Sequence, residues 1–166
     1  MKTLMTSLAL ALAATTGALA ATTGAVAVSS AAIAGPTFTG LEGNTAVSGY
    51  DVVSYFEGSG KPVRGSEQFK VSYKGANYFF ASADNAAKFK QDPAAFTPQY
   101  GGHCAWAMSR GSLAPGDPLL YKVVDGKLYL NFNKNVQQTW LKDVPGFMAK
   151  ADQQWPNIPD SAKFGG

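Results

Sequence analysis

The reactive side chains of this chain are concentrated in one short stretch, Tyr100 to Ser109. It contains His103 and Cys104, which are the only histidine and the only cysteine of the 166 residues, and Met108 follows four positions after the cysteine. A thiolate, a thioether and an imidazole are soft or borderline ligands that suit Cu(I) better than hard cations. The pattern therefore predicts a heavy-metal site of copper type formed by Cys104, His103 and Met108.

The residues that follow the cysteine indicate how these ligands would be held. The segment Ala105-Trp106-Ala107-Met108 favours a short helix that begins at Cys104. In the first turn of a helix, free N–H groups and the helix dipole stabilise a thiolate, so we expect a thiol pKa below the ordinary value of about 8.5. Cys104 and Met108 then share one helical face, and His103 approaches from the glycine-rich turn before it.

Two other interpretations of the stretch remain open. In a thiol-redox protein, Cys104 would be a nucleophile, with His103 or Asp51 as its base. His103 is a weak candidate for that base because neighbouring residues seldom place both side chains for direct proton transfer. In a non-catalytic scaffold or interaction domain, Cys104 would be a structural cysteine that behaves as a small hydrophobic residue. The sequence has no carboxylate pair at catalytic spacing and no phosphate-binding glycine loop, so we lean against an enzyme.

Composition narrows the classes of partner. Hydrophobic residues make up 46% of the chain and charged residues 15%, values typical of a soluble globular protein. Lys and Arg number 14 against 11 Asp and Glu, and the basic residues are scattered rather than clustered. We therefore expect no nucleic-acid partner, and we expect either a metal ion or a periplasmic protein partner.

The beginning of the chain predicts export. Lys2 is followed by an apolar run over 4–14 and by Ala18-Leu19-Ala20, a small-residue cleavage signal. Residues 1–20 are predicted to be a signal peptide, with cleavage as late as residue 34 as the alternative, and the mature protein is predicted to be periplasmic. Thr, Ser and Gly interrupt the apolar run, so no stable membrane span is expected in the mature form. A single cysteine in an exported chain cannot form an internal disulfide, which favours a functional thiol.

The rest of the chain predicts a flexible Ala/Thr/Gly tether over 21–43, one folded domain over 44–158 and a tail over 159–166. Within the domain, 69–81 alternates apolar and polar residues around a turn, and a second hairpin is centred on Asp125-Gly126. Hairpins and helices without strand–helix–strand alternation argue for an α+β fold, in which two antiparallel β-hairpins pack against short helices. No internal repeat is visible along the sequence.

Several polar residues are predicted to begin helices. Ser82, Asp92 and Asn133 are expected to be helix caps, while Asp51 is either a cap or a site carboxylate. Asn131 can present its amide to a ligand or bond to a loop. Phe147, Ala151 and Trp155 recur at four-residue spacing, so they should form an apolar stripe that covers the sheet.

Several motifs resemble the YHS domain family. The resemblance rests on Tyr73-Lys74-Gly75, Tyr78-Phe79-Phe80-Ala81-Ser82, Phe89 and Asp92-Pro93-Ala94-Ala95-Phe96. More widely, over about residues 44–158, the chain resembles small exported YHS-domain proteins of Gram-negative bacteria through Gly49-Tyr50-Asp51, Gln99 to Trp106, Ala114 to Pro118, Asp125 to Asn131 and Asn133-Lys134. Related YHS and TRASH domains are associated with heavy-metal handling through cysteine ligands, copper above all, so the resemblance implies a metal-handling role.

The chain departs from that metal pattern at the ligand positions. Metal-type YHS domains carry cysteine where this sequence has Ala81 and Asn85, and an upstream Cys-Gly pair is replaced by Ser48-Gly49. The ligands of the family are therefore absent, and a metal site would have to be built around Cys104.

Overall fold

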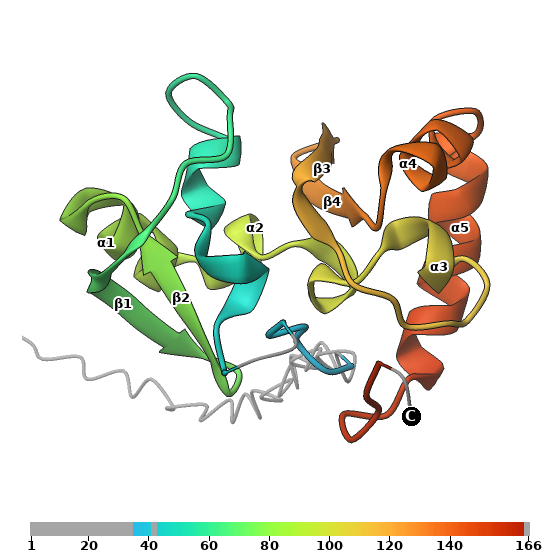
Figure 1. Ribbon diagram of the computed structural model, residues 1–166, viewed down its shortest axis with the longest axis horizontal. Coiled ribbons are helices and arrows are strands. Elements are labelled where there is room, and N and C mark those ends of the chain that lie inside the picture. The colour runs from blue at the N-terminus through green and yellow to red at the C-terminus, as the bar shows by residue number, and fades with distance from the viewer. Residues whose placement is uncertain (1–34, 41–42, 165–166) are drawn as a thin grey trace, which may run out of the picture. The chain divides into compact units, whose positions relative to one another are not determined.

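The computed structural model describes residues 35–40 and 43–164 (Figure 1). The predicted signal peptide, most of the predicted tether and the last two residues of the predicted tail lie outside these residues. Of the predicted tether, residues 35–40 lie against the folded domain, where the backbone N–H of Phe38 donates to the carbonyl of Gly101 over 2.9 Å. Among the described residues, no helix has the length and apolarity needed to cross a membrane.

Two antiparallel hairpins and a set of short helices make up the fold, so the α+β prediction is confirmed (Figure 1). The first hairpin joins β1 (Ser66–Tyr73) to β2 (Ala76–Phe80), and the second joins β3 (Asp117–Val124) to β4 (Lys127–Asn131). The helices, in chain order, are η1 (Ala46–Gly49), η2 (Val52–Tyr55), α1 (Ala83–Gln91), α2 (Pro93–Phe96), η3 (Gln99–Gly102), α3 (Ala105–Met108), α4 (Lys134–Trp140), α5 (Val144–Gln154) and η4 (Trp155–Asn157), where η marks a 3₁₀ helix.

The predicted caps begin the helices for the expected reason. The side chains of Ser82, Asp92 and Asn133 accept hydrogen bonds from the free backbone N–H groups of α1, α2 and α4, over 3.1, 3.2 and 2.9 Å. Asp51 does the same for η2. Each cap satisfies a donor that has no partner within its own helix.

The two hairpins belong to two copies of one structural unit, although no repeat is visible in the sequence. Each copy contains a tight turn, a short helix, a hairpin and a capped helix in the same order. The first copy, repeat 1, consists of η1, η2, β1, β2 and α1, and the second, repeat 2, consists of η3, α3, β3, β4 and α4.

The backbone geometry of the tight turns supports the correspondence. Each turn has three consecutive residues with positive φ: values of 50°, 49° and 76° over 47–49, and of 54°, 60° and 86° over 100–102. The next residue forms an antiparallel bridge to the segment before the hairpin, Tyr50 with Arg64 and His103 with Pro115. The residue after that begins the short helix, which makes Asp51 in repeat 1 equivalent to Cys104 in repeat 2.

The hairpins correspond residue by residue as well. In both of them the register shifts at the same place: Ser66 pairs with Phe80 before the shift in repeat 1, and Asp117 pairs with Asn131 in repeat 2. Phe80 and Asn131 are therefore equivalent positions. The residues that follow them, Ala81 and Phe132, are equivalent for the same reason.

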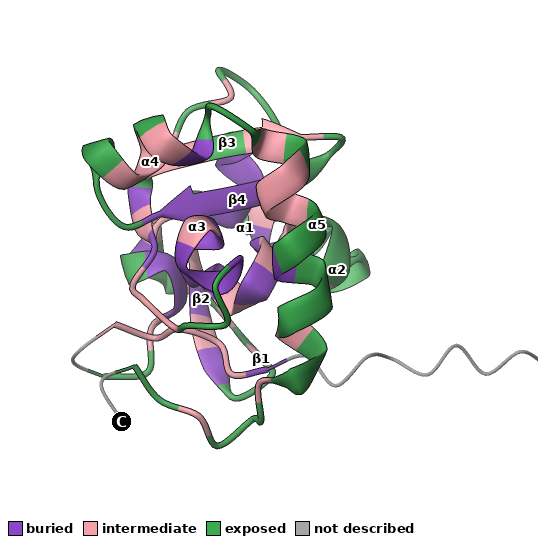
Figure 2. Cartoon of the chain, turned by 90° about the vertical axis from the view of Figure 1, so that its right-hand side faces the viewer, coloured by how far each residue is buried: buried purple, intermediate pink, exposed green. Residues whose placement is uncertain are grey.

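The main hydrophobic core joins the two repeats. It contains Val52, Val53 and Phe80 of repeat 1 together with Leu128 and Leu130 of β4. Figure 2 shows β4 buried along most of its length, whereas much of α5 is exposed. Tyrosine hydroxyls also link the repeats, because Tyr55 donates to the carbonyl of Pro118 and Tyr121 to that of Gly60, each over 2.9 Å.

The predicted stripe on α5 belongs to a second cluster. Ala151 is fully buried, while Phe147 and Trp155 are partly buried against Met108, Tyr129 and Trp140. The stripe therefore packs on α3 and on one side chain of β4, and it does not cover a whole sheet. Phe96 is partly buried at the edge of the main core.

Candidate functional site

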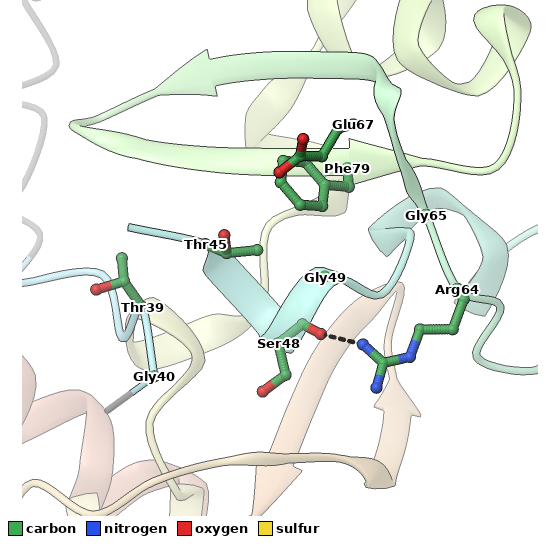
Figure 3. Close-up of a pocket in the computed structure, with 9 residues that line it drawn as sticks. All are labelled: Thr39, Gly40, Thr45, Ser48, Gly49, Arg64, Gly65, Glu67 and Phe79. Atoms are coloured by element: carbon green, nitrogen blue, oxygen red, sulfur yellow. Dashed lines mark hydrogen bonds between the residues drawn. The ribbon is translucent and has the colours of Figure 1, made fainter. Parts of the chain in front are cut away.

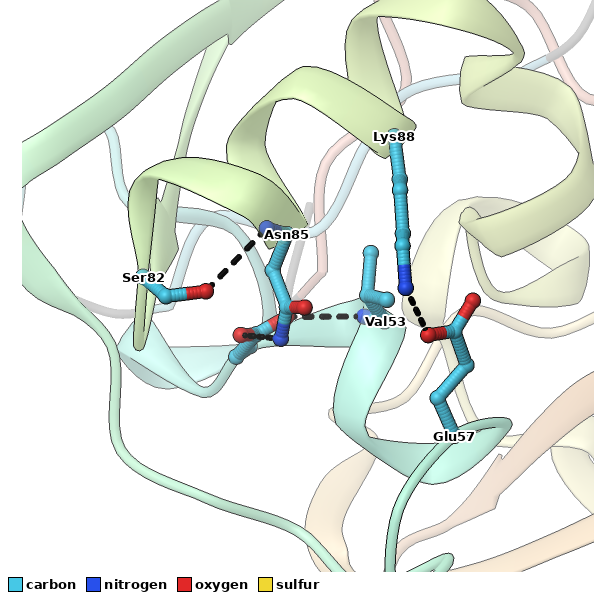
Figure 4. A network of polar contacts seen from close by, with 6 residues as sticks. Val53, Glu57, Ser82, Asn85 and Lys88 are labelled. Carbon is cyan, nitrogen blue, oxygen red and sulfur yellow. Dashed lines mark hydrogen bonds and ion pairs between the residues drawn. The ribbon is translucent and has the colours of Figure 1, made fainter.

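Asp51 is a fully buried carboxylate with three hydrogen-bond donors around it, and two of these donors belong to Val53 and Asn85, which Figure 4 labels. Its Oδ1 accepts from the backbone N–H of Val53 over 2.8 Å. Its Oδ2 accepts from the backbone N–H of Ala81 over 2.9 Å and from the side-chain Nδ2 of Asn85 over 2.7 Å. Of the two roles predicted for Asp51, the cap is confirmed, and the same carboxylate also ties η2 to the start of α1.

Two of these donors belong to the positions that carry cysteine in metal-type YHS domains. Ala81 and Asn85 both donate to one oxygen of Asp51. In this chain they hold a carboxylate by hydrogen bonds.

Cys104 occupies the equivalent position in repeat 2. It precedes α3, its side chain is fully buried, and its backbone N–H donates to the carbonyl of Ala114 over 2.9 Å. Burial raises the pKa of the Cys104 thiol, although the backbone N–H groups of Ala107, Phe132 and Trp106 act in the opposite direction. The expectation of a lowered thiol pKa is therefore wrong, because desolvation outweighs the free N–H groups at the start of this short helix.

Asn131 is the polar neighbour of the thiol. The Cys104 Sγ lies 3.9 Å from Asn131 Oδ1, in the geometry of a weak S–H donor. Asn131 is fully buried, and its Nδ2 has no hydrogen-bond partner among the described residues. A buried amide without a partner is costly, so this side chain marks an incompletely satisfied polar site.

His103 is directed toward the segment before the domain. Its Nε2 lies 3.2 Å from the carbonyl oxygen of Pro36, and its ring packs beside Phe38 and Trp155. Burial lowers the pKa of His103, while the carbonyls of Ala114 and Pro36 oppose the shift. The imidazole therefore serves as a neutral contact between 35–40 and the domain.

Met108 ends α3 and is fully buried in the second cluster with Tyr129 and Trp140. Of the three predicted ligands, Cys104 thus contacts Asn131, His103 contacts Pro36, and Met108 packs among rings. In the part of the chain that the structure describes, no group of three or more His, Cys, Asp and Glu side chains is placed to hold a metal ion.

A groove that no sequence pattern predicts is lined by residues of both repeats. It consists of two adjoining cavities that share Gly40, Ser48 and Arg64, and we call it the Arg64 groove. The polar part, of about 500 Å³, is shown in Figure 3. The apolar part, of about 560 Å³, is lined by Phe38, Gly40, Ser48, Tyr50, Arg64, Pro115, Gly116, Asp117, Pro118, Leu119 and Phe132.

Arg64 is held in a fixed position in this groove. Its guanidinium lies 4.4 Å from the centroid of the Tyr50 ring, and its Nη1 donates to the carbonyl of Ser48 over 2.6 Å (Figure 3). It forms no ion pair with any residue that the structure describes. Leu119 and Phe132, which are 57% and 48% exposed, line the apolar part of the same groove.

Comparison with known proteins identifies one part of the chain. The family model for the YHS domain matches residues 58–100, which include the first hairpin, α1 and α2. No curated protein and no solved structure matches the chain. The resemblance inferred from the motifs around the first hairpin is thus confirmed for residues 58–100, which match the YHS domain model.

Proposed function

We propose that this chain is an exported YHS-domain protein that acts as a non-catalytic binding module. The observation that carries the proposal is the Arg64 groove, which is lined both by exposed apolar side chains and by an arginine that has no ion pair with a described residue. A cavity of about 560 Å³ falls within the range of small-molecule sites. Exposed leucine and phenylalanine side chains that gather in a hollow are typical of binding surfaces.

The ligand class follows from the chemistry of the two sides. Leu119, Phe132 and Phe38 can cover an apolar body. The Arg64 guanidinium, with its plane fixed by Tyr50, can donate two parallel hydrogen bonds to a carboxylate or sulfonate. Asp117 also lines the groove, and its Oδ1 already accepts from the backbone N–H of Leu119 over 2.8 Å. The groove therefore suits an amphipathic organic anion.

Two fluorescent probes test this function. Anilinonaphthalene sulfonate has an apolar body and one anionic group, and N-phenylnaphthylamine has a closely similar apolar body without charge. We expect Leu119→Ser and Phe132→Ser to weaken binding of both probes by about fivefold or more, because each removes apolar contact area. Arg64→Gln should weaken binding of the sulfonate alone.

Leu141→Ser is the matched control, since Leu141 is 45% exposed and lies outside the groove. If Leu119→Ser and Phe132→Ser bind both probes as Leu141→Ser does, the groove is not a binding site. If Arg64→Gln changes the affinity for both probes equally, the groove binds apolar molecules without selecting an anion.

Export is part of the proposal and rests on the sequence of residues 1–34. Intact-mass measurement of the periplasmic fraction should give a mature chain that begins between Ala21 and Gly35. A full-length mass in the membrane fraction would contradict export.

Cu(I) binding by Cys104, Met108 and His103 stays a prediction. Two sulfur ligands one helical turn apart in a dry environment suit Cu(I), but the thiol must lose its proton against the effect of burial. His103 would also have to leave the Pro36 carbonyl. Competition with a Cu(I) chelator measures the affinity of the chain for Cu(I). Equal affinity in wild type, Cys104→Ser and Met108→Leu would show that these side chains do not bind the ion.

A further inference from the structure

The repeat gives Cys104 two of the backbone donors that surround Asp51, and an asparagine amide lies beside it as well. Around Asp51 the donors are the N–H two residues later (Val53), the N–H that follows β2 (Ala81) and an asparagine side chain (Asn85). Two of them have counterparts in repeat 2, the N–H groups of Trp106 and Phe132. The third group beside the sulfur is the amide of Asn131, which comes from the position equivalent to Phe80 and now accepts from the thiol through Oδ1. We call these three groups the Cys104 donor set.

A thiol satisfies this donor set poorly. Sulfur in a neutral thiol is a weak acceptor, whereas an ionised carboxylate accepts at two oxygens. The amide of Asn131 is only partly satisfied beside the thiol. Its Oδ1 faces the Sγ at 3.9 Å, while its Nδ2 has no hydrogen-bond partner among the described residues. The amide is fully buried, so no solvent reaches it in compensation. Repeat 2 thus has the surroundings of an anion with two oxygens, and it holds a thiol instead.

We propose that Cys104 is an oxidation site and that its stable product is the cysteine sulfinate, held by the Cys104 donor set as the carboxylate of Asp51 is held in repeat 1. A sulfinate carries two oxygens and one negative charge at the end of a one-carbon side chain, as an aspartate does. Rotation of the Asn131 amide by 180° exchanges its oxygen and nitrogen, so that Nδ2 donates to a sulfinate oxygen. The N–H groups of Trp106 and Phe132 then donate to the oxygens of an anion, as Val53 and Ala81 do.

The chemistry requires a peroxide as oxidant. The thiolate sulfur attacks one oxygen of hydrogen peroxide, the O–O bond breaks, and the sulfenate forms while the leaving hydroxide takes a proton to become water. Attack on a second peroxide gives the sulfinate and a second water. The chain has no other cysteine, so a disulfide within the chain cannot intercept the sulfenate.

The burial of Cys104 makes this oxidation slow, and the slow rate determines what the site can do. Peroxide reaches the sulfur only when the four-residue helix α3 opens locally. Cys104 therefore accumulates a modification under sustained oxidation and does not turn over a substrate. The donor set determines which product persists.

Mass spectrometry of the folded chain tests the product. After prolonged exposure to hydrogen peroxide, the peptide with Cys104 should gain two oxygens on the cysteine and stop there. The partly buried Met148 serves as a control for the oxidant. An unmodified Cys104 in native protein whose Met148 is fully oxidised would overturn the proposal.

Substitutions test the donor set without peroxide. Cys104→Asp places a carboxylate where the sulfinate would lie, and Cys104→Ser is its uncharged control. Adding Asn131→Leu should raise the unfolding equilibrium constant about tenfold or more in the Cys104→Asp protein, because a hydrogen bond to a buried charge is lost. In the Cys104→Ser protein the same change should be less than about threefold, since no charge is left unpaired. Equal effects in both proteins, or a Cys104→Asp protein that fails to fold while Cys104→Ser folds, would overturn the proposal.

Discussion

Asp51→Asn should be among the most destabilising conservative changes in this protein. The carboxylate is fully buried and accepts from Val53, Ala81 and Asn85 over 2.8, 2.9 and 2.7 Å. Asparagine has nearly the same shape but only one acceptor oxygen. Whichever way its amide is turned, its NH₂ group faces at least one of these donors, which then loses its partner.

The magnitude follows from those contacts. A hydrogen bond to a charged group contributes about 1.5–3 kcal/mol, and a buried donor without a partner costs about 1–3 kcal/mol. With one or two of the three bonds lost, we expect the free energy of unfolding to fall by about 3–5 kcal/mol, a large part of the roughly 5–15 kcal/mol of a typical domain.

Urea unfolding followed by tryptophan fluorescence measures this loss, with the m-value compared between variants. Asp92→Ala is the matched control, because Asp92 caps α2 with a single bond of 3.2 Å from an exposed position. Loss of such a cap should cost about 1 kcal/mol. If Asp51→Asn costs no more than Asp92→Ala, the three donors do not depend on the charge, and the argument from the repeat loses its basis.

Three further predictions concern titratable groups. Because Cys104 is fully buried and burial raises its pKa, a thiol reagent at pH 8 should react with it much more slowly in the native than in the unfolded chain, and equally fast reaction in both would contradict the described burial. Burial lowers the pKa of His103 in the folded chain, so on acidification the unfolded chain takes up a proton at a higher pH than the folded chain does. The free energy of unfolding should therefore fall as pH drops through about 6.5, the ordinary pKa of histidine. His103→Gln should flatten that profile between pH 7 and 5, and an unchanged slope would exclude His103 as the cause. Burial raises the pKa of Tyr78 to about 12, so the contribution of this neutral tyrosine to the free energy of unfolding is complete below about pH 10 and is lost as pH rises toward 12. Tyr78→Phe should remove that part of the loss of stability at alkaline pH. An identical pH profile of stability in the variant would contradict the prediction.

Features set by neighbouring residues were predictable from the sequence. The Asp125-Gly126 turn has φ values of 49° and 70°, a conformation that this pair adopts more readily than most. Ser82 and Asn133 cap helices through bonds to backbone groups three residues away. Such signals need no knowledge of the rest of the fold, which is why the hairpins and most of the helix starts are where the sequence placed them.

The environment of Cys104 depends on residues far away in the chain, and there the prediction was wrong. The sequence correctly indicates a helix after the cysteine, but the pKa depends on how β4 and the loop before β3 cover the sulfur. Asn131 and Phe132 reach it from the second hairpin, and Ala114 from the loop. No local pattern determines that burial, so the low thiol pKa expected from the helix alone does not hold.

The repeat is clearer in backbone geometry than in residue types, so the sequence alone does not reveal it. At the buried site the equivalent positions differ in type, because Asp51 pairs with Cys104 and Phe80 with Asn131. Buried sites of one backbone can be satisfied by different side chains if each finds its partners. In repeat 1 the buried site is polar and fully paired, and in repeat 2 it is a thiol beside an unpaired amide.

The structural unit is also larger than the YHS match. The matched segment, 58–100, includes Ala81 and Asn85 but not Asp51, the carboxylate to which both donate. It also omits Val52 and Val53, which fill the core under the first hairpin, and the β4 leucines that close this core from repeat 2. A fragment limited to 58–100 would therefore expose the apolar face of β2 and leave two donors without their acceptor. Because those missing parts come from both sides of the segment, the first hairpin needs the preceding turn and the second repeat in order to fold.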